Sequence, residues 1–264
     1  MRIDFHTHSK LAKKMPFSQA YTEGILREAK QSGLDAICLT EHYNGVDLDK
    51  SFDYIIENMD RCGDCFIHKN GLKIFPGLEI NAAEGGHFLT IGFMEDIQAI
   101  YRELGGYLKK KEHPHFAKIL EITKPHSVLL GVSHPFRQNS EGNSMPDLSD
   151  ELLKQLDFVD LNGKDIVFDK TGTERQVQDL SNRLKLPILA GSDTHQSYQF
   201  GCIYNQFQKS FTTIGELREA IGHSAYSVIH GESACLQVRA AGIIKRTLKE
   251  IHALGGDYVS VLFE

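Results

Sequence analysis

Three features that the sequence lacks narrow what this protein can be. No apolar stretch approaches the roughly 18 residues of a membrane-spanning helix, so we expect no membrane insertion. Positive charge is not in surplus, since the formal net charge is −6, and this argues against stable nucleic-acid binding. The longest basic run, residues 109–111, is followed at once by Glu112 and is interpreted as a solvated helix end.

The number and the spacing of the cysteines do not indicate a set of disulfide bonds. Five cysteines are scattered along the chain, which favours free thiols in a reducing compartment over a disulfide framework. Met1 and Arg2 lead directly into a strand-like segment and not into a signal peptide, so we expect a cytoplasmic protein. Cys62 and Cys65 form a Cys-x-x-Cys pair without a second pair, which we interpret as incidental; a local metal or redox role is the alternative.

The composition is that of a globular protein. The chain has 264 residues, of which 41% are hydrophobic and 24% charged, and no repeat, low-complexity tract or linker divides it. We therefore predict a single domain over residues 1–264. The sequence gives no indication of the oligomeric state.

Short β-rich runs alternate with helical patterns along most of the chain, as in βαβ units around a parallel sheet. The predicted strands are 2–5, 36–40, 73–78, 127–132, 158–161, 187–190 and 227–229, with an additional strand at 86–93. The predicted helices are 18–31, 47–61, 147–156, 174–184 and 213–221, with two more between 96 and 124.

Residues of the types that commonly ligate metals (His, Asp and Glu) follow almost every predicted strand. They are His6 and His8, Glu41 and His42, Glu79, His134, and Asp193 and His195. The C-terminal ends of parallel barrel strands open onto one face, so these side chains should converge there. Histidines and carboxylates crowded into one cleft would repel or desolvate one another without cations, and the convergence therefore predicts a metal cluster.

One His-x-His pair serves as an internal control. With 13 histidines in the chain, such a pair is expected by chance. His113 and His115 follow a lysine run and lie between helices, so we predict that they lie on the surface without a metal role. By contrast, His6 and His8 leave a strand on the same side and can bind one ion together.

Six segments resemble the motifs of the PHP superfamily, the polymerase and histidinol phosphatase superfamily. They are residues 4–9 (DFHTHS), 39–42 (LTEH), 76–80 (PGLEI), 86–89 (GHFL), 132–135 (VSHP) and 191–195 (GSDTH), in the family's order. The resemblance implies a distorted (β/α)7 TIM-like barrel of the PHP type that binds two or three divalent Zn, Mn or Fe ions.

The same resemblance implies how the ligands are divided among the ions. One metal would be bound by His6, His8, Glu79 and Asp193; a second by His87, His134 and a bridging Glu79; a third by His42 and His195. Relatives with three metals supply a further His or Asp soon after the first motif, where this chain has Lys13 and Lys14. Glu41 is read as either a partner of a ligand or a weak ligand.

These metals suit the hydrolysis of phosphate esters. We expect a hydroxide that bridges two ions to attack phosphorus in line, with Glu79 as the bridging ligand. Arg137 is the candidate phosphate clamp, with a structural salt bridge as the alternative. His42 or His195 would protonate the leaving group if the third ion is absent. Residues 162–164 (NGK) end in Lys164, which either contacts substrate or belongs to a turn that begins a helix.

The predicted function is therefore a metal-dependent phosphatase that acts on a small phosphomonoester. The alternatives are a nuclease or phosphodiesterase of the same superfamily, and a non-catalytic, metal-stabilised binding protein. An amidohydrolase is disfavoured, because the metal-bridging Lys of that family has no clear match. The identity of the small phosphorylated substrate cannot be read from the sequence.

Overall fold

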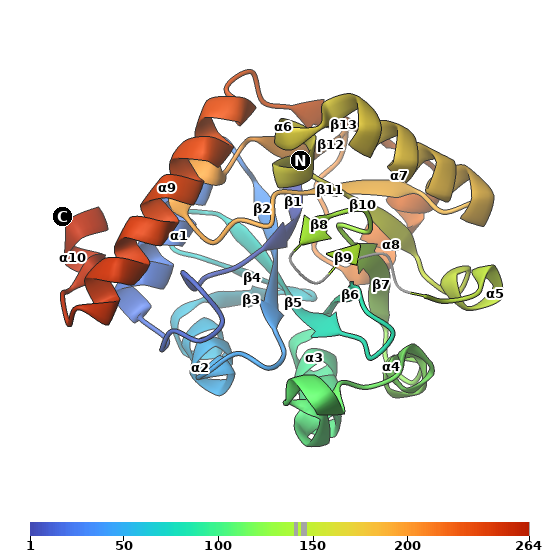
Figure 1. The fold of residues 1–264 in the computed structure, drawn as a ribbon, viewed down its shortest axis with the longest axis horizontal. Helices are drawn as coiled ribbons and strands as arrows, with labels where there is room; N and C mark the ends of the chain where they lie inside the picture. Colours follow the sequence, from blue (N-terminus) through green and yellow to red (C-terminus); the bar gives the residue numbers. More distant parts are fainter. Residues whose placement is uncertain (140–141, 144–146, 264) are drawn as a thin grey trace.

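The computed structural model describes residues 1–139, 142–143 and 147–263. The strands alternate with helices, and Figure 1 shows the strands at the centre with helices around them. The strands are β1 (Arg2–Thr7), β2 (Ala36–His42), β3 (Asp60–Cys62), β4 (Cys65–Ile67), β5 (Lys73–Asn81), β6 (His87–Gly92), β7 (Val128–Ser133), β8 (Gln138–Asn139), β9 (Gly142–Asn143), β10 (Phe158–Asn162), β11 (Ile188–Gly191), β12 (Ile203–Phe207) and β13 (Tyr226–His230).

The α-helices are α1 (Gln19–Gln31), α2 (Leu48–Asn58), α3 (Met94–Glu103), α4 (Phe116–Thr123), α5 (Asp150–Leu153), α6 (Gly163–Phe168), α7 (Lys170–Leu184), α8 (Ile214–Gly222), α9 (Ala234–Ala253) and α10 (Tyr258–Leu262). Short 3-10 helices lie at η1 (Leu104–Tyr107), η2 (Lys110–Glu112) and η3 (Ser197–Gln199). Two predicted helix starts are observed: Ser18 caps α1, and Thr213 with Glu216 forms a capping box on α8. Among the described residues, no helix combines the length and apolar character needed to cross a bilayer.

The predicted PHP-type barrel is confirmed. The barrel strands are hydrogen-bonded in the order β11-β10-β7-β6-β5-β2-β1, and β12 and β13 continue the sheet beyond β1. The barrel is nearly closed where β1 meets β11, through a parallel bridge between Thr7 and Thr194. β6 runs antiparallel to both β5 and β7, as an additional strand inserted in an otherwise parallel barrel.

Two apolar clusters hold the barrel together. Inward-facing side chains such as Ile3, Phe5, Phe75 and Phe158 fill its interior, and a larger cluster lies between the strands and the surrounding helices. Helix α8 adds Leu217 to the interior cluster. This packed interior supports one open end, at which the strand ends present polar side chains.

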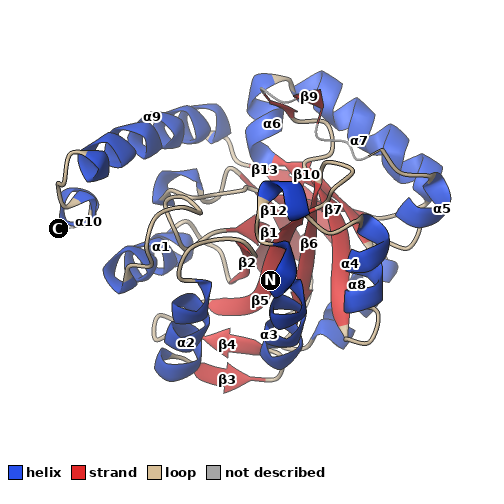
Figure 2. Cartoon of the chain, turned by 60° about the horizontal axis from the view of Figure 1, so that its bottom comes forward, coloured by secondary structure: helices blue, strands red, loops and turns tan. Residues whose placement is uncertain are grey.

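Several elements were not predicted from the sequence. Among them are the β3–β4 hairpin, β12, α6 and the long helix α9. Helix α9 contacts η3 and α6, and Figure 2 shows it at the same end of the barrel as β9 and α6. The Cys62–Cys65 pair lies in the β3–β4 hairpin with both thiols free, and neither belongs to a metal-ligand cluster of the described residues.

Candidate metal centre

The predicted ligands converge at one end of the barrel. His6 and His8 lie at the end of β1, His42 ends β2, Glu79 lies near the end of β5, His87 begins β6, His134 follows β7, and Asp193 and His195 follow β11. His87 reaches the same end from the start of its strand because β6 is antiparallel. Four of these side chains, those of His6, His8, Glu79 and His134, are at most 3% exposed.

A local irregularity in β1 brings both of its histidines into the site. Ile3 and Phe5 point into the barrel, and simple alternation would place Thr7 there next. The pairing of β1 with β2 shifts register between Asp4 and Thr7, which re-aims the chain so that His6 and His8 both face the ligand cluster.

The closure of β11 onto β1 requires glycine. A Cβ atom at Gly191 would lie 2.3 Å from the Cβ of His6, so any side chain here would push the strands apart. Asp193 follows at once, and its backbone N–H donates to the carbonyl oxygen of His6 at 2.8 Å. The approach of the two strands therefore places Asp193 beside His6.

Glu79 lies at the centre of the cluster. Its Oε1 is 2.7 Å from Nδ1 of His87 and 3.1 Å from Nε2 of His134. Its Oε2 is 2.9 Å from Nδ1 of His42 and 3.5 Å from Nε2 of His8, yet it accepts no well-formed hydrogen bond from the described residues. A buried carboxylate oxygen without a hydrogen bond is costly unless a cation binds it.

A second group of donor atoms lies beside Glu79. The Nε2 atoms of His6 and His8 are 3.3 Å apart, and each lies within 3.7 Å of Oδ1 of Asp193. Three ligand clusters can be defined by donor atoms within 4.8 Å of one another: His6, His8 and Asp193; His6, Glu79 and His134; and His8, His42 and His195. Imidazole nitrogens and carboxylate oxygens in this arrangement fit two or three divalent transition-metal ions.

The third cluster differs from the expectation in one respect. His8 packs between His42 and His195, with ring centroids 4.6 Å and 4.0 Å away, and supplies a third donor to that pair. Lys13 and Lys14, which stand in the sequence where relatives have a further ligand, instead line a separate cavity with His87 and His134. Neither lysine belongs to the third cluster of the described residues.

Two buried carboxylates contact the Nδ1 atoms of His6 and His8, on the side of each ring that faces away from the cluster. Glu41 accepts hydrogen bonds from the backbone N–H and the hydroxyl of Ser9, and its Oε2 lies 3.5 Å from Nδ1 of His8. Asp160, on β10, lies 3.5 Å from Nδ1 of His6. Both contacts leave the Nε2 atoms of these histidines facing the cluster. Of the two readings of Glu41, the geometry favours a partner of a ligand.

Sequence reasoning missed Asp160. The signal was present, since Asp160 interrupts the apolar strand β10 between Val159 and Leu161. A buried acid in such a strand must have polar partners, and it accepts from the backbone N–H of His134 and from the side-chain amide of Asn162.

Two candidate ligands have strained backbones. His134 and Asp193 have φ angles of 30° and 54°, in the left-handed region that side chains other than glycine rarely adopt. Each is held there by a hydrogen bond from its own N–H, to Asp160 and to His6 respectively. Strain of this kind is retained where the surrounding structure fixes a side chain for function.

Arg137 is bonded to protein groups in three directions. Its guanidinium donates to Asp165 at 2.7 Å, to Asp193 at 2.5 Å and to the side-chain oxygen of Asn162 at 2.7 Å. Burial opposes the charge, but Asp193 and Asp165 outweigh it and raise the pKa of Arg137 above its usual value. This geometry favours the salt-bridge reading over the phosphate clamp, and it fixes the side of Asp193 that faces away from His6 and His8.

The electrostatics divide the histidines into two groups. Burial lowers the pKa of His6, but Glu79 and the neighbouring aspartates outweigh it and raise that pKa well above the ordinary value. Burial and the charge of Arg137 lower the pKa of His134 to about 3, and burial with the charge of His8 lowers the pKa of His195. Burial also opposes ionisation of Glu79, yet the surrounding histidines hold its pKa well below the usual range.

The control pair lies outside the ligand clusters of the described residues. His115 is exposed and hydrogen-bonded to Glu84. His113, in contrast, is half-buried rather than on the surface, because its Nδ1 is 2.8 Å from the hydroxyl of Tyr43. It lines the cavity that also contains His87.

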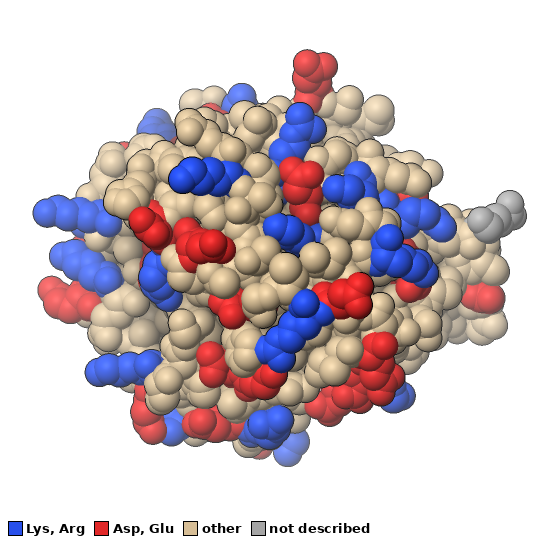
Figure 3. Space-filling view, turned by 180° about the vertical axis from the view of Figure 1, so that it is seen from behind, with Lys and Arg blue, Asp and Glu red and all other residues tan. Residues whose placement is uncertain are grey.

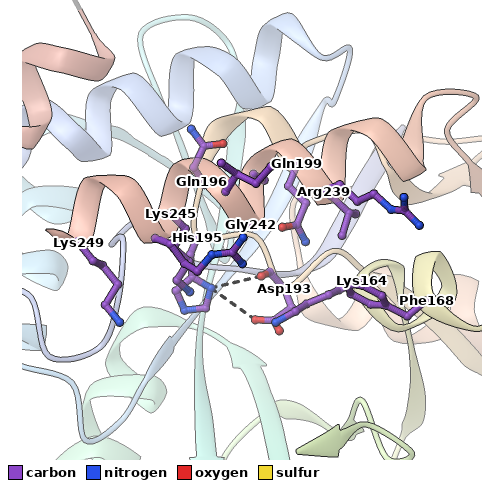
Figure 4. A pocket seen from close by; sticks show the side chains of 14 residues that line it. Lys164, Phe168, Asp193, His195, Gln196, Gln199, Arg239, Gly242, Lys245 and Lys249 are labelled. Carbon is purple, nitrogen blue, oxygen red and sulfur yellow. Dashed lines mark hydrogen bonds and ion pairs between the residues drawn. The ribbon is translucent and has the colours of Figure 1, made fainter. Parts of the chain in front are cut away.

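A second cavity, of about 490 Å³, opens on the other side of the centre. Asp193 and His195 line it together with residues of α6, η3 and α9, and Figure 4 shows Lys249 and Arg239 on opposite sides of His195. Lys164 lines this cavity and stands in the first turn of α6, which Asn162 caps, so the reading of residues 162–164 as a helix start is observed. Lys245 is half-buried beside these groups, and burial lowers its pKa to about 8. The cations of α9 were missed because the helix itself was not predicted.

Comparisons with known proteins agree with this fold. A family model described as PHP-associated matches residues 173–225, which include Asp193 and His195. The predicted resemblance to the PHP superfamily is confirmed. No curated protein sequence matches the chain.

Several solved structures share this fold. PsfC from Pseudomonas syringae PB-5123 superposes with a TM-score of 0.75 at 20% identity, over 94% of this chain and 98% of PsfC. Endonuclease Q in complex with a 27-mer duplex has a TM-score of 0.62 at 18% identity; 84% of this chain matches 56% of that chain, so this protein spans little more than half of its length. A provisionally assigned metal-dependent phosphoesterase from Bifidobacterium adolescentis has a TM-score of 0.51 at 14% identity, over 82% of this chain and 94% of that one. These likenesses show that the chain shares the fold of these structures.

Proposed function

We propose that this protein is a metal-dependent phosphatase that hydrolyses small phosphomonoesters. The observation that supports it is the position of Glu79, whose two carboxylate oxygens face different sets of histidines. A carboxylate in that position can bridge two ions.

The proposed ligands are His6, His8, His42, Glu79, His87, His134, Asp193 and His195. Zn, Mn or Fe ions held there would lower the pKa of a bound water and neutralise charge on the phosphoryl oxygens. The protein's own contribution is to fix the donors. Asp160 and Glu41 orient His6 and His8 from behind, and Arg137 holds Asp193.

Two ligand candidates could also move a proton. His42 is partly exposed, and His195 lines the α9 cavity, so either ring can reach a leaving-group oxygen of a bound ester. We propose His42 or His195 as the general acid when the third cluster holds no ion.

The activity test is a substrate panel. Protein purified with its metals, and protein reconstituted separately with Mn, Zn and Fe, should be assayed on phosphomonoesters, phosphodiesters and single-stranded DNA. We expect phosphomonoesters to be the best substrates. A DNA or diester rate well above every monoester rate would replace this proposal with the nuclease or phosphodiesterase alternative. No turnover by any metal form would leave the non-catalytic alternative.

A further inference from the structure

The cavity beside α9 is continuous with the metal centre. Asp193 and His195 belong to two of the ligand clusters, and the same two residues line the cavity. A ligand held at the metals can therefore extend into this space. Its volume of about 490 Å³ falls in the range of small-molecule sites, about 300 to 1,000 Å³.

The cavity concentrates positively charged side chains. Lys164, Arg239, Lys245, Arg246 and Lys249 line it, and within the described residues their side chains make no ion pair or hydrogen bond. Elsewhere many cations are paired, such as Arg61 with Glu95, Arg183 with Asp150 and Arg218 with Asp157. The face in Figure 3 likewise shows acidic and basic side chains intermingled.

This concentration is unfavourable for the protein alone. Like charges that share one cavity repel, and Asp193, the acid that lines it, is already bonded to Arg137. The chain has a net charge of −6, yet Asp193 is the one carboxylate among the described residues that line this cavity. An anionic ligand would remove the repulsion.

Helix α9 supplies four of these cations, all except Lys164. Lys245 and Lys249 are four residues apart, so they lie one turn apart on the same side. Gly242 lies on the same face, and a Cβ atom there would approach only the guanidinium of Arg246, at 3.9 Å. The small residue leaves room next to Lys245.

We infer that the α9 cavity is a second anion subsite, which binds a phosphate group of the substrate that is not cleaved. The substrate class is then a small bisphosphate, with one phosphate at the metal centre and the other between Lys245 and Lys249. This inference rests on the proposed function for the identity of the cleaved group. The net charge of −6 is unfavourable for binding a nucleic-acid strand, which favours a small molecule.

A binding experiment tests the subsite independently of turnover. Propane-1,3-bisphosphonate and propylphosphonate differ by one phosphonate group, and neither has an ester bond to hydrolyse. Calorimetric titration of the metal-loaded protein should show the bisphosphonate binding at least about tenfold more tightly, as expected for charge-assisted hydrogen bonds to the second group.

The double variant Lys245→Gln/Lys249→Gln should lose this preference, while its affinity for propylphosphonate stays close to that of the wild type. The double variant Lys124→Gln/Lys154→Gln makes an equal change of charge at two exposed positions, just after α4 and α5, and should keep it. Thermal unfolding should show that both variants are folded. A preference retained in the double variant would place the second group at the metals and overturn the inference.

Two further outcomes distinguish this inference from the proposed phosphatase activity and from binding of a nucleic acid. Absence of turnover with the binding preference intact would reject the proposed phosphatase but keep the anion subsite. A 5′-phosphorylated single-stranded oligonucleotide that binds more tightly than the bisphosphonate, and loses that affinity in the double variant, would overturn the small-molecule class.

Discussion

The two flanks of the metal centre hold their positive charge in different ways. The first flank, which we call the β6 flank, is the cavity lined by His87 and Arg137. There Arg137 is bonded to Asp165, Asp193 and Asn162, and so it holds the candidate ligand Asp193 in place. On the side of α9, Lys245 and Lys249 have no such partners among the described residues. The comparison indicates that one flank positions the metals, whereas the other remains available to a ligand.

The largest expected effect lies between the flanks, at Glu79. Glu79→Gln keeps the size of the side chain but removes the charge shared by the histidines, so kcat should fall by about a thousandfold, equivalent to several kcal/mol. The fold should survive, because the apolar interior supports it. Steady-state kinetics with circular dichroism test this. Retained activity would remove Glu79 from the mechanism.

A smaller effect is expected at Arg137. Arg137→Lys keeps the charge but cannot reproduce three hydrogen bonds in different directions, so metal affinity or kcat should fall by about 10- to 100-fold. KM for a phosphomonoester should change little, because the guanidinium is occupied by protein groups. A rise in KM with unchanged kcat would restore the phosphate-clamp reading.

The next prediction compares the lysines of the two flanks. Lys13 and Lys14 line the cavity of about 760 Å³ on the β6 flank. The double variant Lys13→Ala/Lys14→Ala should raise KM about two- to fivefold, since exposed charges contribute little, and should do so equally for mono- and bisphosphates. Selective loss for bisphosphates would move the anion subsite to the β6 flank.

The smallest effect is expected at the control pair. His115→Ala should leave stability, metal content and turnover unchanged. His113→Ala loses the contact with Tyr43 and should cost about 1 kcal/mol of stability without loss of metal. Thermal unfolding and metal analysis separate these outcomes. Loss of metal from either variant would show that this His-x-His pair was wrongly excluded.

The barrel and its ligands could be predicted from the sequence because both depend on local patterns. Each strand is an apolar run, and each of the strand-end ligands except His87 follows such a run at once, so Glu79 and His134 were identifiable without knowing the contacts. Helix α9 was missed although its sequence is helical, because the prediction followed alternation with strands and α9 comes after the last strand.

Other features depend on contacts between distant segments. The half-burial of His113 depends on Tyr43, 70 residues away, and no local pattern reports it. The role of Arg137 depends in the same way on Asp193, which β11 brings beside it. The sequence alone therefore favours the phosphate clamp only slightly over the salt bridge.

The central claim is that Glu79 joins two metal sites, and metal analysis of the purified protein tests it most directly. Mass spectrometry of fully loaded wild-type protein should find at least two equivalents of transition metal per chain, and Glu79→Gln should lose metal from both sites. One equivalent or none in fully loaded wild-type protein, or an unchanged content in the variant, would contradict the account.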